Sequence, residues 1–245
     1  MTPAKDASNL NSAGFRCISC GWKIGRLFVQ YSPGNIRLMK CDNCKAVADP
    51  YIECEFMIIL IDLILHKSKA YRHLLYNMLN LENNNFKAIM LKSFLLHFIL
   101  DACRVTFSVR CKDTSDSMRD GSELVWTTLK VIVDVLFGNF VFASVLWIWV
   151  SILLKLNHNL LRFKEVFFVV LVSSYFKLFL LAMMVWDFPY SVLYIVDIFV
   201  LSSNAVALRV LTRLKMSSCI AISFSAHITK FFAYHWLLSL LKCFR

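Results

Sequence analysis

The sequence has little of what a soluble domain needs at its surface and in its turns. Only 18% of its 245 residues are charged, and it contains 4 prolines and 6 glycines. Soluble domains carry about 25% charged residues and about 45–50% apolar ones. Here 58% of the residues are hydrophobic, and 21 of them are phenylalanine. The composition excludes an ordinary soluble domain and indicates a mainly helical membrane protein with several spans.

The common signatures of catalysis are missing as well. The sequence has no H-E-x-x-H, no G-x-S-x-G, no glycine-rich phosphate loop and no H-x-x-x-x-D pair. His97 and Asp101 are spaced to share one helix face, but a structural contact explains that spacing equally well. We therefore expect a protein that is not an enzyme, with no catalytic residues.

The N-terminal residues contain no apolar core of the kind that a cleavable signal peptide needs. Membrane insertion is expected to use an internal segment, and residues 1–14 are expected to be a flexible N-terminus. The formal net charge is +11. The basic residues lie beside apolar segments, so anionic lipid and the positive-inside rule account for them, and no nucleic-acid partner is expected.

Two Cys-x-x-Cys pairs bracket a short hairpin pattern in residues 15–55. The ligands would be Cys17, Cys20, Cys41 and Cys44. Four thiolates at this spacing suit one tetrahedral Zn²⁺. The apolar runs LFVQY and NIRLMK are separated by Ser32-Pro33-Gly34-Asn35, which is a strong turn signal. The pattern predicts a zinc ribbon whose structural metal offsets a core too small to fold alone.

The two pairs have three alternative interpretations: a redox dithiol, an iron–sulfur site and two disulfides. A thioredoxin-like dithiol needs a βαβ context that is missing, and iron–sulfur spacings differ. The nine cysteines are an odd and mostly dispersed set, which disfavours a disulfide framework. Structural zinc remains the preferred interpretation.

Residues 56–85 are expected to lie at the membrane surface. The apolar run 56–65 is too short to span a bilayer, which suits a surface-lying or re-entrant segment, and a mixture of basic and aromatic residues follows it. An ordinary solvated helix is the alternative. The interface candidates are Lys67, Tyr71, Arg72, His73 and Tyr76.

The remainder, 86–245, is expected to be a helical membrane domain with four or five spans. Four segments are long enough to cross the apolar core of a bilayer: 131–154, 166–186, 191–211 and 219–241. The segment 86–109 is ambiguous, because Lys87, His97, Asp101 and Arg104 share one face.

The basic loops after the first and third of these four spans indicate which side is cytosolic. If 86–109 also spans, the cysteines lie in the cytosol, where thiols stay reduced. Five spans and a cytosolic N-terminus are therefore preferred.

Charged side chains inside a span are costly, so they are candidate functional groups. The hairpin formed by spans 166–186 and 191–211 would bring four polar residues into one intramembrane seam: Ser173, Lys177, Asp197 and Asn204. Such a seam would meet a lipid headgroup, or it would hold the two helices together through an internal ion pair.

The order of these motifs resembles the Arv family of endoplasmic-reticulum membrane proteins. The double Cys-x-x-Cys pattern is followed by VADPYIE, IDLILHKSKAYRHLLYN, SSYFK and VLSSNAVALRV. The resemblance implies a multi-pass protein of the endoplasmic reticulum that mediates intracellular sterol transport and distribution, with effects on sphingolipid metabolism and glycosylphosphatidylinositol-anchor synthesis. The implied partners are membrane lipids: sterol, sphingolipid and glycosylphosphatidylinositol precursors.

One rival function remains open. The cysteine-rich head would act as an adaptor that regulates lipid-synthesis or anchor-synthesis enzymes without moving lipid itself. These enzymes would then be partners of the head, and the spans would only anchor it.

Overall fold

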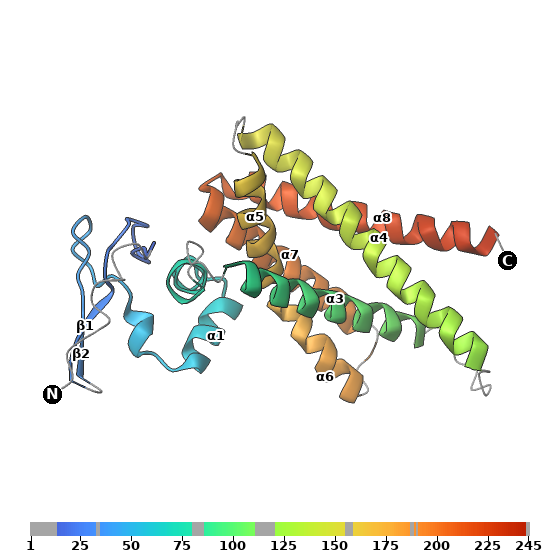
Figure 1. The fold of residues 1–245 in the computed structure, drawn as a ribbon, viewed down its shortest axis with the longest axis horizontal. Helices are drawn as coiled ribbons and strands as arrows, with labels where there is room; N and C mark the ends of the chain where they lie inside the picture. The colour runs from blue at the N-terminus through green and yellow to red at the C-terminus, as the bar shows by residue number, and fades with distance from the viewer. Residues whose placement is uncertain are drawn as a thin grey trace. The chain divides into compact units, whose positions relative to one another are not determined.

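The structure is a computed structural model that describes residues 14–32, 35–79, 86–110, 121–154, 159–186, 189 and 191–243. Most of the expected flexible N-terminus lies outside these residues, as do the turn residues 33–34. So do the loop residues 111–120, 155–158, 187–188 and 190, some of which carry the charges used for orientation. The chain divides into two compact units, Met1–Ile89 and Met90–Arg245, and each is described by itself (Figure 1).

The first unit is built around two similar cysteine-containing loops. In each loop the residue after the second cysteine donates its backbone N–H to the carbonyl of the first: Gly21 to Cys17, and Lys45 to Cys41, both at 2.8 Å. Gly21 and Lys45 both adopt positive φ, at 78° and 59°. Isolated antiparallel bridges close both loops, one of them between Arg16 and Lys23. The two loops therefore present their sulfurs in similar ways.

Between the loops lies a hairpin of strand β1 (Phe28–Ser32) and strand β2 (Asn35–Leu38), paired antiparallel with Phe28 opposite Leu38. After the second loop come a short 3₁₀ turn η2 (Pro50–Glu53) and helix α1 (Phe56–Ile64). Helix α2 (Ser68–Arg72) then continues into a π-helical segment η3 (His73–Met78). The small N-terminal ribbon expected from the cysteine spacing is confirmed.

The second unit is helical. It contains most of α3 (Phe86–Arg110), then α4 (Gly121–Leu154), α5 (Asn159–Ser173), a 3₁₀ turn η4 (Ser174–Leu178) and α6 (Phe179–Val185). Helices α7 (Ser191–Thr212) and α8 (Met216–Cys243) complete it. Helix α8 packs against α4 and α7, and α7 also packs against α5. Their apolar core joins four helices through residues such as Leu146, Val170, Ala205 and Ile222.

Three segments of the described chain are long and apolar enough to cross a membrane: Thr128–Trp149, Phe163–Ala182 and Ser191–Thr212. They correspond to three of the expected spans, which confirms a helical membrane body. The other two expected spans, 86–109 and 219–241, form the long helices α3 and α8 but are not among these three.

Candidate functional site

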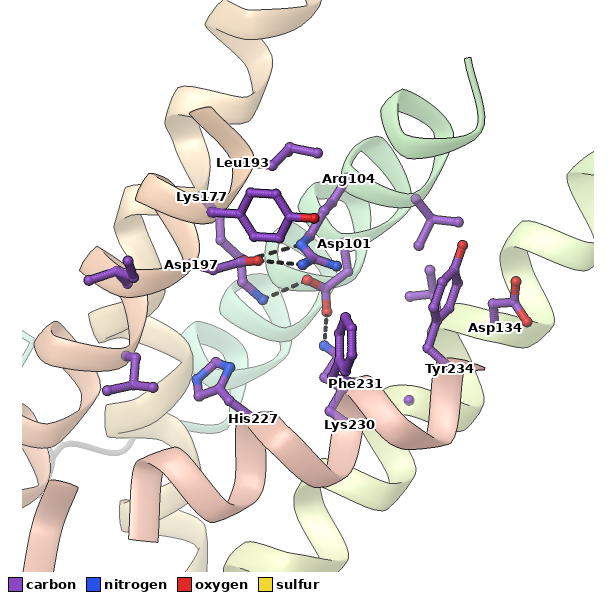
Figure 2. Close-up of a pocket in the computed structure, with 16 residues that line it drawn as sticks. Asp101, Arg104, Asp134, Lys177, Leu193, Asp197, His227, Lys230, Phe231 and Tyr234 are labelled. Carbon is purple, nitrogen blue, oxygen red and sulfur yellow. Dashed lines mark hydrogen bonds and ion pairs between the residues drawn. The ribbon is translucent and has the colours of Figure 1, made fainter. Parts of the chain in front are cut away.

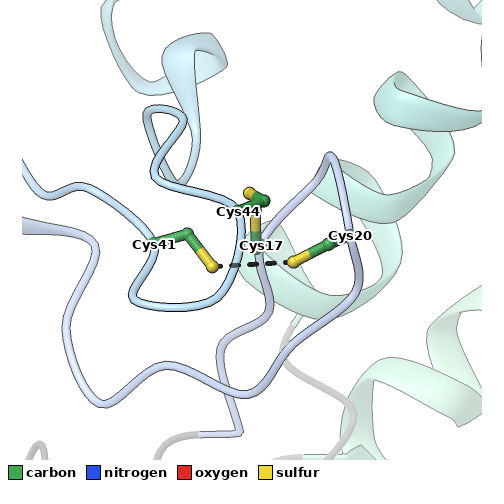
Figure 3. A group of neighbouring side chains, drawn as sticks. All are labelled: Cys17, Cys20, Cys41 and Cys44. Atoms are coloured by element: carbon green, nitrogen blue, oxygen red, sulfur yellow. Dashed lines mark hydrogen bonds between the residues drawn. The ribbon is translucent and has the colours of Figure 1, made fainter.

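The four cysteines of the two loops lie together (Figure 3). Their sulfur atoms are all within 4.8 Å of one another, and the facing pairs Cys17–Cys44 and Cys20–Cys41 are separated by 3.7 and 3.5 Å. A zinc–sulfur bond of about 2.3 Å in a tetrahedron places neighbouring sulfurs about 3.8 Å apart. A disulfide needs about 2.05 Å. The cluster therefore has a geometry that can hold one metal ion.

The thiols of this cluster differ in acidity without a metal. Burial raises the pKa of Cys17 to about 11. Burial also opposes ionisation of Cys20, but hydrogen bonds from the Trp22 backbone, the Asn43 side chain and the neighbouring thiols lower its pKa to about 6. Because only thiolates bind metal, occupation of the cluster must release protons, and the Cys17 thiol, whose pKa is raised, must give up a proton that it keeps at neutral pH without a metal.

Asp49 connects the cysteine loops to η3. It is fully buried, and its carboxylate lies 2.6 Å from His73 Nδ1 and accepts a hydrogen bond from Asn77 Nδ2 at 2.6 Å. It also accepts from the backbone N–H of Tyr51 at 3.1 Å. Asn77 in turn exchanges hydrogen bonds with the backbone of Arg16, next to the first cysteine. A buried carboxylate with three partners fixes the position of η3 against the first loop.

Three of the five interface candidates lie inside the first unit or against its first cysteine loop. Tyr71 is fully buried, and His73 is 7% exposed. Arg72 donates to the carbonyls of Ile18 and Ser19, at 2.8 and 2.6 Å, inside the first cysteine loop. Tyr71 and His73 thus point into the first unit, and Arg72, which is half-buried, holds the first cysteine loop.

The other two candidates have partners of their own. Tyr76 lies under the guanidinium group of Arg16, at 4.5 Å. Lys67 is 53% exposed and donates to Asp62 at 2.7 Å. The apolar surface nearby is supplied by α1, where Phe56, Met57 and Ile61 are exposed, and by Leu65, which directly follows it. A surface-lying α1 remains a prediction.

In the second unit, the span Phe163–Ala182 is not a continuous α-helix. The 3₁₀ turn η4 interrupts it, and the hydroxyls of Ser173 and Ser174 both donate to the carbonyl of Val170. The carbonyl of Ser173 accepts from Ser203 on α7 at 2.6 Å. Irregular backbone is tolerated at membrane depth only where other groups satisfy it, and such interruptions often mark binding sites. The sequence did not predict this turn.

Lys177 lies on this turn and reaches the carboxylate of Asp101 on α3, at 2.6 Å. The other oxygen of Asp101 accepts from Lys230 on α8, also at 2.6 Å. Asp101 thus lies between two ammonium groups, as Figure 2 shows. His97 Nε2 lies 3.2 Å from Lys177 and 3.4 Å from Asp101, and Asn139 accepts from Lys230 at 2.8 Å.

The four residues of the expected seam do not form one group. Ser173 donates to Asn204 at 2.5 Å, so these two do meet across the α5–α7 contact. Asn204 also lies 3.2 Å from His227 on α8. Asp197, however, pairs with Arg104 through Nε and Nη2 of the guanidinium group, and Lys177 pairs with Asp101 instead. The carboxylate that pairs with Lys177 lies on α3, outside the hairpin of the two spans, so the spacing of residues within that hairpin does not predict the pair.

These charged groups line a cavity of about 460 Å³, called the polar cavity below. Its polar lining comprises Asp101, Arg104, Asp134, Lys177, Asp197 and Lys230, and Figure 2 shows them together with His227. Its apolar lining includes Tyr194, Ile198 and Phe231, each at least half exposed on the outside of the helices. Pockets of about 300–1,000 Å³ with apolar walls and a few polar groups are typical of small-molecule sites.

The sequence contained one signal for this cavity. His97, Asp101 and Arg104 form a polar face on α3, and an unmatched lysine occurs in the following spans. Pairing Asp101, the acidic residue of that face, with Lys177 would have predicted their contact. The packing needed to choose between Asp101 and Asp197 is not visible locally.

Known proteins that resemble this chain belong to the family that its motifs suggested. Residues 16–208 match the model of the Arv1-like family. Protein ARV 2 of Arabidopsis thaliana is 47% identical over 215 residues, which cover 88% of this chain and 91% of the relative. The Protein arv1 homolog of Dictyostelium discoideum is 30% identical over 79% of this chain and 83% of its own length.

A more distant animal relative, Protein ARV1 of Bos taurus, is 30% identical over 86% of this chain and 73% of its own length. No solved structure matches the chain. The family model covers the cysteine cluster, η3, the interrupted span and most of α7. The chain therefore belongs to the Arv1-like family.

Proposed function

We propose that this protein mediates the transport and distribution of sterol from the endoplasmic-reticulum membrane, and thereby affects sphingolipid metabolism. Membership of the Arv1-like family supports the broader role in sterol and lipid homeostasis. The observation that carries the transport step is the polar cavity, which lies beside an interrupted span and has exposed apolar residues at its edge. An amphiphile needs such a combination, with polar groups for its head and apolar walls for its body.

The cysteine cluster takes zinc in this proposal. Four sulfur donors in a compact tetrahedral set favour zinc over hard cations, and they leave no open position for catalysis. The metal would hold the two loops together and so position η3 through Arg72 and Asp49. The N-terminal unit would lie on the cytosolic side, where thiols stay reduced. No enzymatic step is assigned to the chain.

Sterol transfer between vesicles tests the proposal. The full chain is reconstituted into proteoliposomes with a fluorescent sterol, and acceptor vesicles report its arrival. Wild-type protein is expected to accelerate transfer, and Lys177→Leu is expected to lose this acceleration, because it removes a buried charge from the cavity. Lys215→Leu is the matched control, since Lys215 is exposed in the turn between α7 and α8. No acceleration by folded, metal-loaded wild-type protein would overturn the transport function.

A second candidate is the adaptor function of the N-terminal unit. Trp22 and Tyr31 are 57% and 67% exposed on the ribbon, and exposed aromatic residues are enriched at protein interfaces. The full chain carrying Trp22→Ser and Tyr31→Ser would then fail to co-purify with lipid-synthesis enzymes. Sterol transfer in proteoliposomes would be unchanged by these substitutions, which separates the two functions.

A further inference from the structure

The charges at one end of the polar cavity do not balance. Asp101 is the single carboxylate shared by Lys177 and Lys230, and this group of three has one excess positive charge. The neighbouring Arg104 and Asp197 form their own pair, which adds no net charge. Lys177 is only 4% exposed. A buried excess charge is costly unless a counter-charge is present.

Two buried polar atoms near the cavity also lack partners within the described part of the chain. One is Asn139 Nδ2, a donor on the amide that accepts from Lys230. The other is Asp134 Oδ1, an acceptor on α4 in the wall of the cavity, where the residue is 6% exposed. Buried polar atoms without partners are rare in folded proteins and each calls for a physical explanation.

These unmatched groups are separated in space. Figure 2 shows Asp134 on α4, apart from the group of Asp101, Lys177 and Lys230, with Phe231 and Tyr234 between them. No hydrogen bond or ion pair among the described residues joins Asp134 to either lysine. The six charged groups of the lining balance as a whole, but one end of the cavity has an excess of basic groups, which suits an anion, and the other has a buried acceptor without a donor in the described chain.

We propose that the polar cavity binds an anionic amphiphile that also carries a hydroxyl, with its acidic group at Lys177 and Lys230 and its hydroxyl donating to Asp134. A phosphate diester with a hydroxylated headgroup has this chemistry, and its acyl chains would leave over Ile198 and Phe231. A sterol supplies the hydroxyl but no anion, so it satisfies only Asp134. This inference deepens the proposed lipid function and rests on it, because it names a second class of lipid for the same cavity.

Four lipids separate the two requirements. Phosphatidylinositol has a charged phosphate and hydroxyls, phosphatidylmethanol has the charge alone, cholesterol has the hydroxyl alone, and phosphatidylcholine has neither free. Detergent-purified full-length protein is mixed with each lipid at equal mole fraction, and bound lipid is counted by native mass spectrometry. Phosphatidylinositol is expected to bind about 10-fold more tightly than cholesterol or phosphatidylmethanol, the effect of one hydrogen bond to a charged group.

Two variants test whether Asp134 and Lys230 bind the lipid. Asp134→Leu is expected to reduce phosphatidylinositol binding to the level of phosphatidylmethanol, and Lys230→Gln to reduce it to the level of cholesterol. Asp134→Leu removes an unmatched buried atom, so its thermal unfolding temperature is expected to stay the same or rise. A purely structural carboxylate would lower that temperature. Ser144→Ala, on α4, and Lys215→Gln are the matched controls, expected to bind all four lipids as the wild type does.

Equal binding of phosphatidylinositol and cholesterol by the wild-type protein would overturn the inference without any variant. Wild-type binding of phosphatidylinositol by folded Asp134→Leu would do the same. The experiment measures equilibrium binding and no transfer. A protein that prefers phosphatidylinositol but moves no sterol in proteoliposomes would therefore refute the transport function and leave the inference standing.

Discussion

The ammonium group of Lys177 donates to the carboxylate of Asp101 at 2.6 Å, although the two residues are 76 positions apart in the sequence. Lys230, a further 53 residues along the chain from Lys177, bonds the second oxygen of the same carboxylate. One acidic side chain on α3 therefore holds η4 and α8. Its removal has different consequences from the removal of either lysine.

Asp101→Asn is expected to destabilise the helical unit most among substitutions in this group. Asparagine keeps the shape but leaves the buried ammonium group of Lys177 and the partly buried one of Lys230 without a counter-charge. Removing one partner of a buried ion pair costs about 3–5 kcal/mol. Lys177→Met should cost less, because Asp101 keeps Lys230. Thermal unfolding in one detergent, read by helical circular dichroism, measures both.

The double variant Asp101→Asn with Lys177→Met tests whether the lost stability comes from the unpaired ammonium groups. It removes one of the two stranded ammonium groups and should be more stable than Asp101→Asn alone. Asp42→Asn, at an exposed carboxylate in the second cysteine loop, is the control and should change little. If Asp101→Asn unfolds at the same temperature as Asp42→Asn, the pairing described here does not stabilise the protein.

Metal removal is expected to affect the two units unequally. A metal ion would join the loops around Cys17 and Cys41, and structural zinc sites contribute folding free energy directly. A chelator should therefore raise amide hydrogen exchange over residues 14–54 and leave α4 and α7 nearly unchanged. Exchange followed by mass spectrometry resolves these segments.

The zinc content of the wild type and of two cysteine variants tests which residues bind the metal. Wild-type protein should carry one zinc ion per chain, and Cys17→Ser should lose it. Cys54→Ser should keep it, because Cys54 lies outside the cluster and its sulfur contacts only the carbonyl of Pro50 among the interactions found. Zinc retained by Cys17→Ser at the wild-type level would contradict the four-sulfur site.

Asp49→Ala is expected to loosen the metal centre without touching a ligand. The substitution removes the acceptor of Tyr51 N and His73 Nδ1, and it removes one of the two acceptors of Asn77 Nδ2, which keeps the carbonyl of Arg16. Each unmatched buried donor costs about 1–3 kcal/mol. The rate at which a coloured chelator withdraws zinc should rise, while the stoichiometry at saturation stays at one. Glu53→Ala, a nearby acidic residue outside this network, should release zinc at the wild-type rate.

The sequence predicted the elements of this protein better than the contacts between them. The ribbon followed from the spacing of Cys17, Cys20, Cys41 and Cys44, because two such pairs have few alternative geometries. The meeting of Ser173 with Asn204 followed from helical period and the short turn between the two helices. Both inferences use neighbours along the chain, for which the geometry is fixed by secondary structure.

The contacts that were not predicted are those set by packing. Lys177 was compared with Asp197 because both lie in one hairpin, whereas α3 supplies Asp101 from outside it. Likewise, the basic and aromatic residues of 71–73 have a composition typical of a membrane interface. The placement of Arg72 and His73 depends on the carbonyls of the first cysteine loop and on Asp49, partners that lie more than 20 residues away. Composition does not specify which side of a short helix faces the protein.

Tyr51 provides the pH dependence that the structure predicts most directly. Burial, together with the hydrogen bond to Asp62 at 2.7 Å and the negative charge of that carboxylate, raises its pKa well above the ordinary value of 10.0. A group whose pKa is raised by folding contributes stability that is fully present below its unfolded pKa and is lost as the pH rises toward the folded value. The N-terminal unit should therefore lose stability above about pH 10, where the unfolded tyrosine ionises and the folded one does not.

Tyr51→Phe removes this ionisation and keeps the ring that lies 5.4 Å from His73. The variant should be less stable than the wild type near neutral pH, because Asp62 loses a donor, and the difference should shrink as the pH rises above 10. Zinc release followed at increasing pH measures the stability of the unit, and the difference in tyrosinate absorbance between the two proteins reports the ionisation of Tyr51 itself. Ionisation of Tyr51 at its ordinary pKa in the folded protein would show that its hydroxyl is not held by Asp62, and the stability difference would then stay constant with pH.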